Sequence, residues 1–356
     1  MDSPRDPLPR AAARAQPVIG LLLGDPSSIG PELAVRLLTR PQVLRDAQLV
    51  IIGDRPVLEA GERVVGARID TVPVASLAEV AQVPAHRIAM VALDAIGADA
   101  IEPARMTEAS GRYALRGLEA AARGVADGHL DGVTFAPLNK GAMRLAGLAH
   151  EDELRLLQSL LGVEGFVCEF NVTGRLWTSR VTSHIPLAAV AGAIDGPTIE
   201  DAVAILERSL RAAGVAAPRV GVAALNPHAG DGGTLGREEI EVIGPAVQRM
   251  RERGVDARGP LPADTIFVAA RDGAFDGVVS MYHDQGQIAM KLLGFDTGVT
   301  VLGGLPAPFT TCASGTAFDI VGRGIANVEG LAHALAIGTR MAAQALAQRA
   351  APATAS

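Results

Sequence analysis

The chain has 356 residues, with 32 Lys and Arg against 39 Asp and Glu and a formal net charge of −7, which argues against a nucleic-acid partner. A composition of 49% hydrophobic and 20% charged residues is typical of a folded globular protein, and only 3% aromatic residues disfavours a pure protein-recognition module. No apolar run approaches the ~18–20 residues of a membrane span. The two cysteines, Cys168 and Cys312, suit a reducing compartment as isolated thiols, so we expect a cytoplasmic protein.

Apolar runs alternate with segments of helical period along most of the chain. Residues 1–17 and 350–356 lack such a pattern, and we expect disordered tails there. The expected strands are 18–24, 49–54, 132–138, 219–226, 277–284 and 298–304, and the expected helices are 31–40, 55–64, 140–161 and 328–349. This alternation predicts an α/β fold with a largely parallel sheet.

Gly- and Pro-rich turns follow several of these strands, as in GDPSSIGPEL, APLNKG and NPHAGDGGTLG. Turns at strand ends carry ligands in open α/β sheets, and their backbone N–H groups at helix starts suit phosphate. Lys140 and Lys291 lie beside such turns and are candidates for binding an anion. None of the turns is a Walker loop or a Rossmann fingerprint.

Three of the seven histidines occupy equivalent places, because each follows an apolar, strand-like run within a few residues: His184 in RVTSHIPL, His228 in VAALNPHAG and His283 in VVSMYHDQG. We expect them to meet at one edge of a sheet, where neutral imidazoles would bind Zn²⁺, Co²⁺ or a similar ion with an open position for catalysis. A structural role remains the alternative for each histidine taken alone. Three acids nearby would orient the imidazoles or cap helices: Asp231, Asp264 and Asp284.

The long motifs TSHIPL, NPHAGDGGTLGREE, GPLPADTIF, YHDQGQIAMK and GTAFDIVGRG, with the turns above, run in order between Val18 and Arg349. Together they resemble the 4-hydroxythreonine-4-phosphate dehydrogenase family, PdxA. The resemblance implies a two-lobed fold like isocitrate and isopropylmalate dehydrogenases, and a homodimer with its active site at the interface. It also implies NAD-linked oxidation of a small phosphorylated hydroxy acid. We expect one lobe at 18–135 plus 300–349 and a second at 136–299 that carries the metal histidines.

The resemblance also implies roles for single residues. The family's metal ligands fall on His184, His228 and His283, with Zn²⁺, Mg²⁺, Co²⁺ or Mn²⁺ as the ion. Its substrate-binding His and Lys fall on His150 and Lys291. We take Lys291, Lys140 and Asp264 as candidate catalytic residues. No residue is assigned to the cofactor, and NADP remains open beside NAD.

Several positions depart from the family pattern in the expected substrate pocket. Glu151 stands for a Thr, Thr300 for an Asn and Phe309 for an Arg, while an Asp-His pair is replaced by Ala313 and Ser314. A phenyl ring cannot replace a guanidinium that grips a carboxylate or phosphate, so we expect a changed substrate, with Glu151, Thr300 and Phe309 as binding residues.

The stretch GVTVLGGLPAPFTTCASGTAFDIVGRG resembles a second branch of the family, the 4-phospho-D-threonate and 4-phospho-D-erythronate 3-dehydrogenases. We therefore predict NAD- and metal-dependent oxidation, with decarboxylation, of one of these acids. The alternatives are the 4-hydroxythreonine-4-phosphate dehydrogenase of pyridoxal phosphate biosynthesis, a dihydrodiol dehydrogenase of terephthalate-type catabolism, and a silent ligand-binding paralogue.

Overall fold

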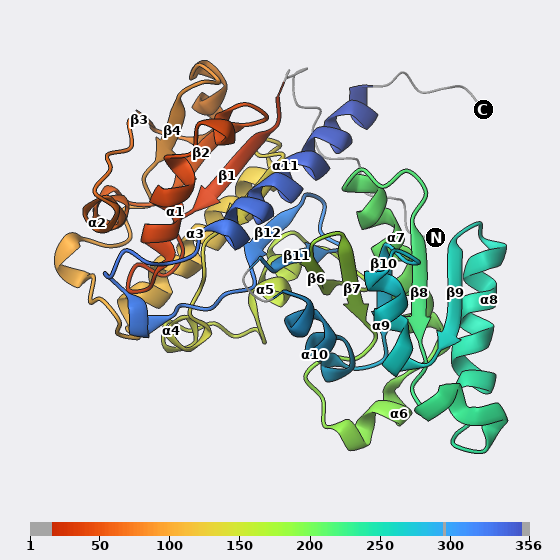
Figure 1. Cartoon of the computed structure of the whole chain (residues 1–356). Helices are drawn as coiled ribbons and strands as arrows, with labels where there is room; N and C mark the ends of the chain where they lie inside the picture. Colours follow the sequence, from red (N-terminus) through yellow and green to blue (C-terminus); the bar gives the residue numbers. More distant parts are fainter. Residues whose placement is uncertain (1–15, 295–296, 351–356) are drawn as a thin grey trace. The chain divides into compact units, whose positions relative to one another are not determined.

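The computed structural model describes residues 16–294 and 297–350. The chain forms two compact units, Met1–Val163 with Leu305–Ser356, and Glu164–Gly304 (Figure 1). The expected tails lie outside the described residues except for Gln16, Pro17 and Ala350. Pro17 is buried and its carbonyl accepts a hydrogen bond from the Gln48 N–H at 2.9 Å, and Ala350 ends the last helix.

The first unit contains six strands in the order β3-β4-β2-β1-β5-β12, and every pair of neighbours is parallel. The strands are β1 (Val18–Leu22), β2 (Gln48–Ile52), β3 (Thr71–Val74), β4 (Ile88–Val91), β5 (Gly132–Phe135) and β12 (Phe309–Cys312). All residues of β1, β2, β5 and β12 are buried. This explains the continuous apolar runs at β1 and β2, because a parallel sheet is covered by helices on both faces.

The helices of the first unit are α1 (Gly30–Leu38), α2 (Arg55–Val65), α3 (Glu108–Ala126), α4 (Lys140–Leu145), α5 (Glu153–Leu160) and α11 (Glu329–Ala350). Helix α1 packs on α2, and α11 packs on β5 and β12. Helices α4 and α5 pack on α3, which keeps residues 136–163 in this unit rather than in the second lobe expected for them.

The second unit contains the strands β6 (Cys168–Thr173), β7 (Leu176–Arg180), β8 (Arg219–Ala223), β9 (Asp256–Leu261), β10 (Gly277–Ser280) and β11 (Val299–Gly303). They lie in the order β11-β6-β7-β10-β8-β9. The β11–β6 and β6–β7 pairs are antiparallel and the others are parallel. An α/β fold with largely parallel sheets is thus confirmed, and β11 belongs here because it pairs with β6.

Helices cover both faces of the strands in this unit. They are α6 (Val190–Ala193), α7 (Gly196–Ala212), α8 (Gly244–Glu252), α9 (Ala263–Arg271) and α10 (His283–Gly294). A Cβ added to Gly277 would contact Leu206 and Leu210 of α7. The next residue, Val278, packs in a cluster with Phe267 of α9 and Met290 of α10. Successive residues of a strand point to opposite faces, so α7 lies opposite α9 and α10.

The structure interrupts the helix expected over 140–161. Helix α4 ends at Leu145, Gly147 follows with φ of +96°, and α5 begins only after Asp152, whose Oδ1 accepts the Arg155 N–H at 2.9 Å. Asp152 is therefore the N-cap of α5. The break leaves His150 and Glu151 in the connecting loop.

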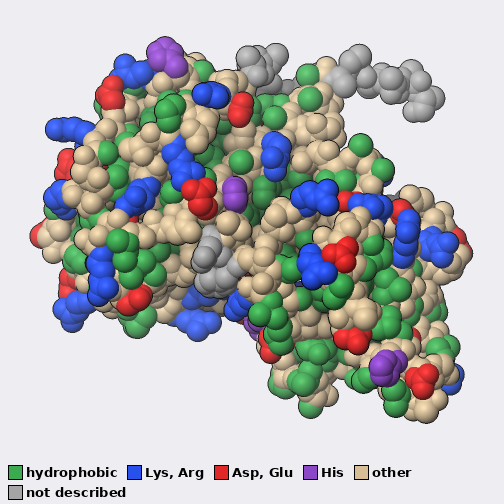
Figure 2. Space-filling view, in the orientation of Figure 1, with side chains coloured by type: hydrophobic (Ala, Val, Ile, Leu, Met, Phe, Trp, Pro, Cys, Tyr) green, Lys and Arg blue, Asp and Glu red, His purple; other side chains and the backbone are tan. Residues whose placement is uncertain are grey.

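Other expectations from composition can be compared with the structure. Cys168 and Cys312 are both buried, and neither forms a disulfide within the described residues. Among the described helices, none combines the length and hydrophobicity that a membrane span requires. On the face shown in Figure 2, acidic and basic side chains are interspersed in each unit.

Candidate metal and substrate site

Three neighbouring strands of the second unit lead to the three predicted metal histidines. Strands β7, β10 and β8 are adjacent and parallel, so their carboxyl ends lie at the same edge of the sheet. His184 follows β7, His283 begins α10 after β10, and His228 follows β8. The order of the strands explains how residues 44 and 55 positions apart in the sequence reach one edge.

The structure brings His184 and His283 together. Their ring centroids are 5.5 Å apart, and both line a pocket of about 400 Å³ together with Ile185, Leu187 and Tyr282. The loops that carry them are joined: the Thr182 hydroxyl donates to the Met281 carbonyl at 2.8 Å. His228 is not among the residues that line this pocket.

Asp284 orients the imidazole of His283. Its Oδ1 lies 2.6 Å from His283 Nδ1. An ionised carboxylate can only accept a hydrogen bond, so the proton of a neutral imidazole must be on Nδ1, and Nε2 presents its lone pair. This is the arrangement that metal-binding histidines show in proteins. Asp231 lies in the turn that carries His228, and Asp264 is exposed in the first turn of α9.

The side chain of Gln285 links the start of α10 to the end of β8 by hydrogen bonds. Its Oε1 accepts the Met281 N–H and its Nε2 donates to the Ala224 carbonyl, both at 2.7 Å. The strand end before His283 is therefore fixed to the strand end before His228. Sequence reasoning did not single out Gln285, although it stands in the quoted motif YHDQGQIAMK.

His228 lies in a left-handed turn at Pro227–Gly233, which we call the His228 turn. Five consecutive residues from His228 to Gly232 have φ values from 44° to 80°. This conformation costs roughly 1–2 kcal/mol for each residue that has a Cβ. His184 also has a positive φ, of 51°. Such strain persists only where the surrounding structure imposes it, and it concentrates at functional sites.

Glu239 anchors the chain that enters the His228 turn. It is 4% exposed, and its Oε1 accepts the N–H groups of Leu225 and Asn226 at 2.9 and 2.7 Å. Its Oε2 accepts the Asn226 side-chain amide at 3.0 Å. Burial acts to raise the pKa of Glu239, but the hydrogen bonds from Asn226 and Leu225 hold it below its ordinary value.

A buried ion pair supports the loop that carries His184. Arg180 is 6% exposed at the end of β7, where its Nη2 donates to Glu169 Oε2 at 2.8 Å and its Nε donates to the Ser183 hydroxyl at 2.9 Å. The guanidinium thus connects the strand to the residue that precedes His184.

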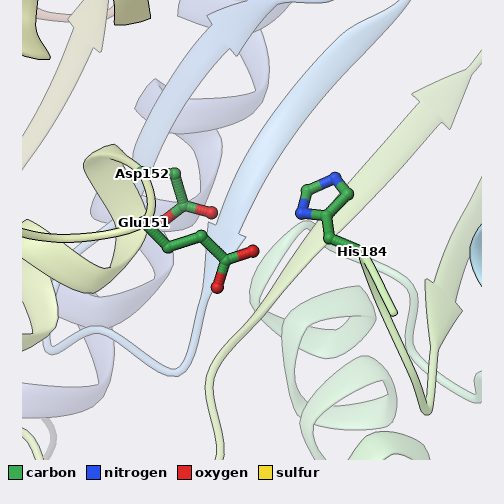
Figure 3. A group of neighbouring side chains, drawn as sticks. All are labelled: Glu151, Asp152 and His184. Carbon is green, nitrogen blue, oxygen red and sulfur yellow. The ribbon is translucent and has the colours of Figure 1, made fainter. Parts of the chain in front are cut away.

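Most remaining candidates lie in the first unit. Asn139 caps α4 by accepting the Ala142 N–H at 3.0 Å, and Lys140 Nζ lies 3.4 Å from Glu153 Oε2. Glu151 is exposed next to His150, before the N-cap Asp152. Figure 3 shows the side chains of Glu151 and Asp152 at the start of α5, and that of His184 after β7.

The candidates for substrate binding differ in exposure. Lys291 is exposed on α10, and Thr300 is half-buried in β11. Phe309 is 0% exposed in β12. Ala313 and Ser314 follow β12, and the Ser314 hydroxyl contacts Cys312 Sγ at 3.1 Å.

Four backbone N–H groups of the GDPSSIGPEL turn are hydrogen-bonded within the protein. Ser27 N donates to Asp25 Oδ1, Ser28 N to the Asp25 carbonyl, Ile29 N to the Thr316 carbonyl and Gly30 N to the Ser28 hydroxyl. The N–H groups that the sequence offered to a phosphate are therefore already bonded within the protein.

Comparison with known proteins decides the family. Residues 45–338 match the model of the pyridoxal phosphate biosynthetic protein PdxA. The chain belongs to the PdxA family. A putative 4-hydroxythreonine-4-phosphate dehydrogenase 2 of Pseudomonas aeruginosa is 44% identical, over 92% of this chain and 98% of that protein. A crystal structure of 4-hydroxythreonine-4-phosphate dehydrogenase from Klebsiella pneumoniae superimposes with a TM-score of 0.80 at 32% identity, covering 93% of this chain and 99% of that one.

Two other PdxA relatives carry different substrate names. The D-threonate 4-phosphate dehydrogenase of Cupriavidus necator is 38% identical over 92% of this chain and 97% of that protein. The 4-hydroxythreonine-4-phosphate dehydrogenase of Marinobacter nauticus is also 38% identical, over 91% of this chain and 95% of that protein. Overall identity therefore does not choose between the two substrates.

Proposed function

We propose that this PdxA-family protein is a dehydrogenase that oxidises the C3 hydroxyl of a 4-phosphorylated 3-hydroxy acid, with NAD and a divalent metal ion. Our first candidates are 4-phospho-D-threonate and 4-phospho-D-erythronate. The observation that carries the proposal is the convergence of three histidine-bearing strand ends in a chain whose relatives are named dehydrogenases.

The chemistry of the donor set fits a divalent ion. His184 and His283 are neighbours, and Asp284 leaves Nε2 of His283 available as a donor. His228 would complete the set from the end of β8. When bound, the ion would act as a Lewis acid on the substrate hydroxyl and lower its pKa.

Lys291 is suited to hold an anionic group of the substrate. It follows His283 by eight residues on α10, which is about 12 Å along a helix axis. Its ammonium would therefore bind a group remote from the reacting carbon, such as the phosphate, and would orient the substrate along α10.

Oxidation at C3 would give a 3-keto acid, which loses its carboxyl group as CO₂. We include NAD because the family resemblance implies it. The internally bonded N–H groups of the GDPSSIGPEL turn do not fit a bound pyrophosphate. We assign no residue to NAD and derive no step from its binding.

A second candidate substrate is 4-phosphohydroxy-L-threonine, which carries an ammonium group at C2. The exposed carboxylate of Glu151, at the start of α5, would be a suitable partner for this cation. The two candidates differ in the group at C2, so a single variant can separate them.

The test is the initial rate of NADH formation with the three compounds side by side. We expect 4-phospho-D-threonate or 4-phospho-D-erythronate to give the highest kcat/KM. We also expect Glu151→Gln to change kcat/KM for these acids less than it changes kcat/KM for 4-phosphohydroxy-L-threonine. Exclusive turnover of 4-phosphohydroxy-L-threonine would overturn the substrate assignment, and turnover of none would overturn the proposed activity. Glu164→Gln is the matched control, because Glu164 lies outside every motif of the predicted site.

A further inference from the structure

We propose that Glu239 is a positioning residue that holds His228 in the orientation needed to bind the metal ion. The inference rests on the proposed metal set of His184, His228 and His283. Glu239 makes its hydrogen bonds to Leu225 and Asn226 rather than to a candidate metal ligand. It acts through the backbone that enters the His228 turn.

The hydrogen bonds of Glu239 fix the chain just before His228. A single carboxylate binds two consecutive backbone N–H groups, of Leu225 and Asn226, and also the Asn226 side chain. The direction in which the chain leaves β8 is thereby set two residues before His228. Because Glu239 is buried, water cannot readily replace it as the acceptor.

The middle of the His228 turn also lies against Glu239. A Cβ added to Gly230, which has φ of +80°, would lie 2.7 Å from Glu239 Oε2. The carboxylate thus occupies the space beneath the turn as well as bonding its entry. Gly232 has a similar φ of +65°, but a Cβ there would meet no atom within 4 Å.

The local structure of Glu239 is itself unusual. It begins a π-helical turn, Glu239–Ile243, directly before α8. Such turns are rare and occur frequently at functional sites. The Ile240 N–H and the Glu241 N–H both donate to the carbonyl of Arg237, which lies two residues before this turn.

The hydrogen bonds between Asn226 and Glu239 also require a carboxylate at position 239. Asn226 Nδ2 donates to Glu239 Oε2 and also to Glu238 Oε2, at 3.0 and 2.7 Å. In Glu239→Gln, one acceptor oxygen becomes an NH₂ group, and two donors then face each other. Flipping the Asn226 amide would place its oxygen against the Glu238 carboxylate, so the network cannot simply reverse.

The experiment measures the affinity of the full-length protein for Co²⁺ alone, followed by its visible absorption, with circular dichroism to confirm the fold of each variant. We expect Glu239→Gln to weaken Co²⁺ binding roughly tenfold, as is usual for residues that orient a ligand, and to change the Co²⁺ spectrum. Glu241→Gln is the matched control, because Glu241 lies in the same turn but pairs with Arg237.

A second pair of variants tests the inference without changing Glu239. We expect Gly230→Ala to weaken Co²⁺ binding and Gly232→Ala to weaken it much less, although both add a Cβ at positive φ. Equal affinities for wild type and Glu239→Gln, or equal losses in the two glycine variants, would overturn the inference.

His228→Ala separates this failure from that of the proposed metal set. If His228→Ala loses Co²⁺ binding while Glu239→Gln does not, only the positioning role of Glu239 is wrong. If His228→Ala binds Co²⁺ as tightly as wild type, the metal set itself is wrong, and the role of Glu239 is wrong with it.

Discussion

Asp25 in the first unit is a buried carboxyl group whose ionisation opposes folding. It is 1% exposed after β1, where Oδ1 accepts the Ser27 N–H at 2.9 Å. Within the described residues, Oδ2 has no hydrogen-bond partner. Burial raises the pKa of Asp25 from 3.8 to about 6, and the Ser27 N–H and the side chains of Ser110 and Asn139 offset this only in part.

The sign of the effect follows from this raised pKa. Between pH 3.8 and about 6 the folded protein keeps a proton that the unfolded chain releases, so stability falls as the pH rises through that window. At about 1.36 kcal/mol per pKa unit, the loss is roughly 1.5 kcal/mol at pH 5 and roughly 3 kcal/mol above pH 7. Asn in place of Asp25 retains the Oδ1 acceptor and removes the charge.

We therefore predict that Asp25→Asn raises the free energy of unfolding by roughly 3 kcal/mol at pH 7.5 and by about half of that at pH 5. Urea titrations followed by circular dichroism at the two pH values measure the difference. A variant that is no more stable than wild type at pH 7.5, or whose gain does not depend on pH, would refute the reasoning.

Asp54→Asn is the matched control, because the same substitution should have the opposite sign there. The two carboxylate oxygens of Asp54 accept four backbone N–H groups, those of residues 93–96, at 2.8 to 2.9 Å. An amide retains only one of these oxygens, and its NH₂ group would face two N–H donors. We expect a loss of about 2–6 kcal/mol, since each unsatisfied buried donor costs about 1–3 kcal/mol.

Two further predictions concern the second unit. Arg180→Met leaves Glu169 unpaired in a largely buried position, so we expect the free energy of unfolding to fall by about 3 kcal/mol. Adding Glu169→Leu should recover most of this loss in urea titrations, and no recovery would contradict the ion-pair explanation. Lys291→Ala should raise KM at least tenfold with a smaller change in kcat, because Lys291 is proposed to bind an anionic group remote from the reacting carbon. Steady-state kinetics measure both constants, and an unchanged KM would exclude that role.

The sequence predicted those parts of the fold that depend on neighbouring residues. The continuous apolar run at Val18–Leu22 is a buried parallel strand, and the closing helix, expected at 328–349, is α11 at Glu329–Ala350. Family membership followed from long motifs in a fixed order.

What the sequence did not reveal depends on contacts between distant residues. The GDPSSIGPEL turn looked open to an anion, yet one of its N–H groups is bonded to Thr316, which is close only in the folded chain. The anchoring role of Glu239 requires that the carboxylate fold back onto Leu225 and Asn226. A pair of adjacent glutamates after a glycine-rich turn was the only signal, and exposed acidic residues give the same signal.

The break between α4 and α5 was also missed. The segment 140–161 has helical periodicity throughout, and Gly147 alone is a weak helix breaker. In the structure two local features divide the segment, the positive φ of Gly147 and the N-cap Asp152, and α4 and α5 each pack on α3. The same packing moves the unit boundary to Val163.

The central claim is that three histidines at adjacent strand ends hold a metal ion that the oxidation requires. The most direct test is the rate of NADH formation from 4-phospho-D-threonate after removal of metal with EDTA and again after Co²⁺ or Zn²⁺ is added back. Our account predicts that EDTA abolishes the rate, that either ion restores it in wild type, and that neither restores it in His184→Ala, His228→Ala or His283→Ala. An undiminished rate in the EDTA-treated protein would contradict it.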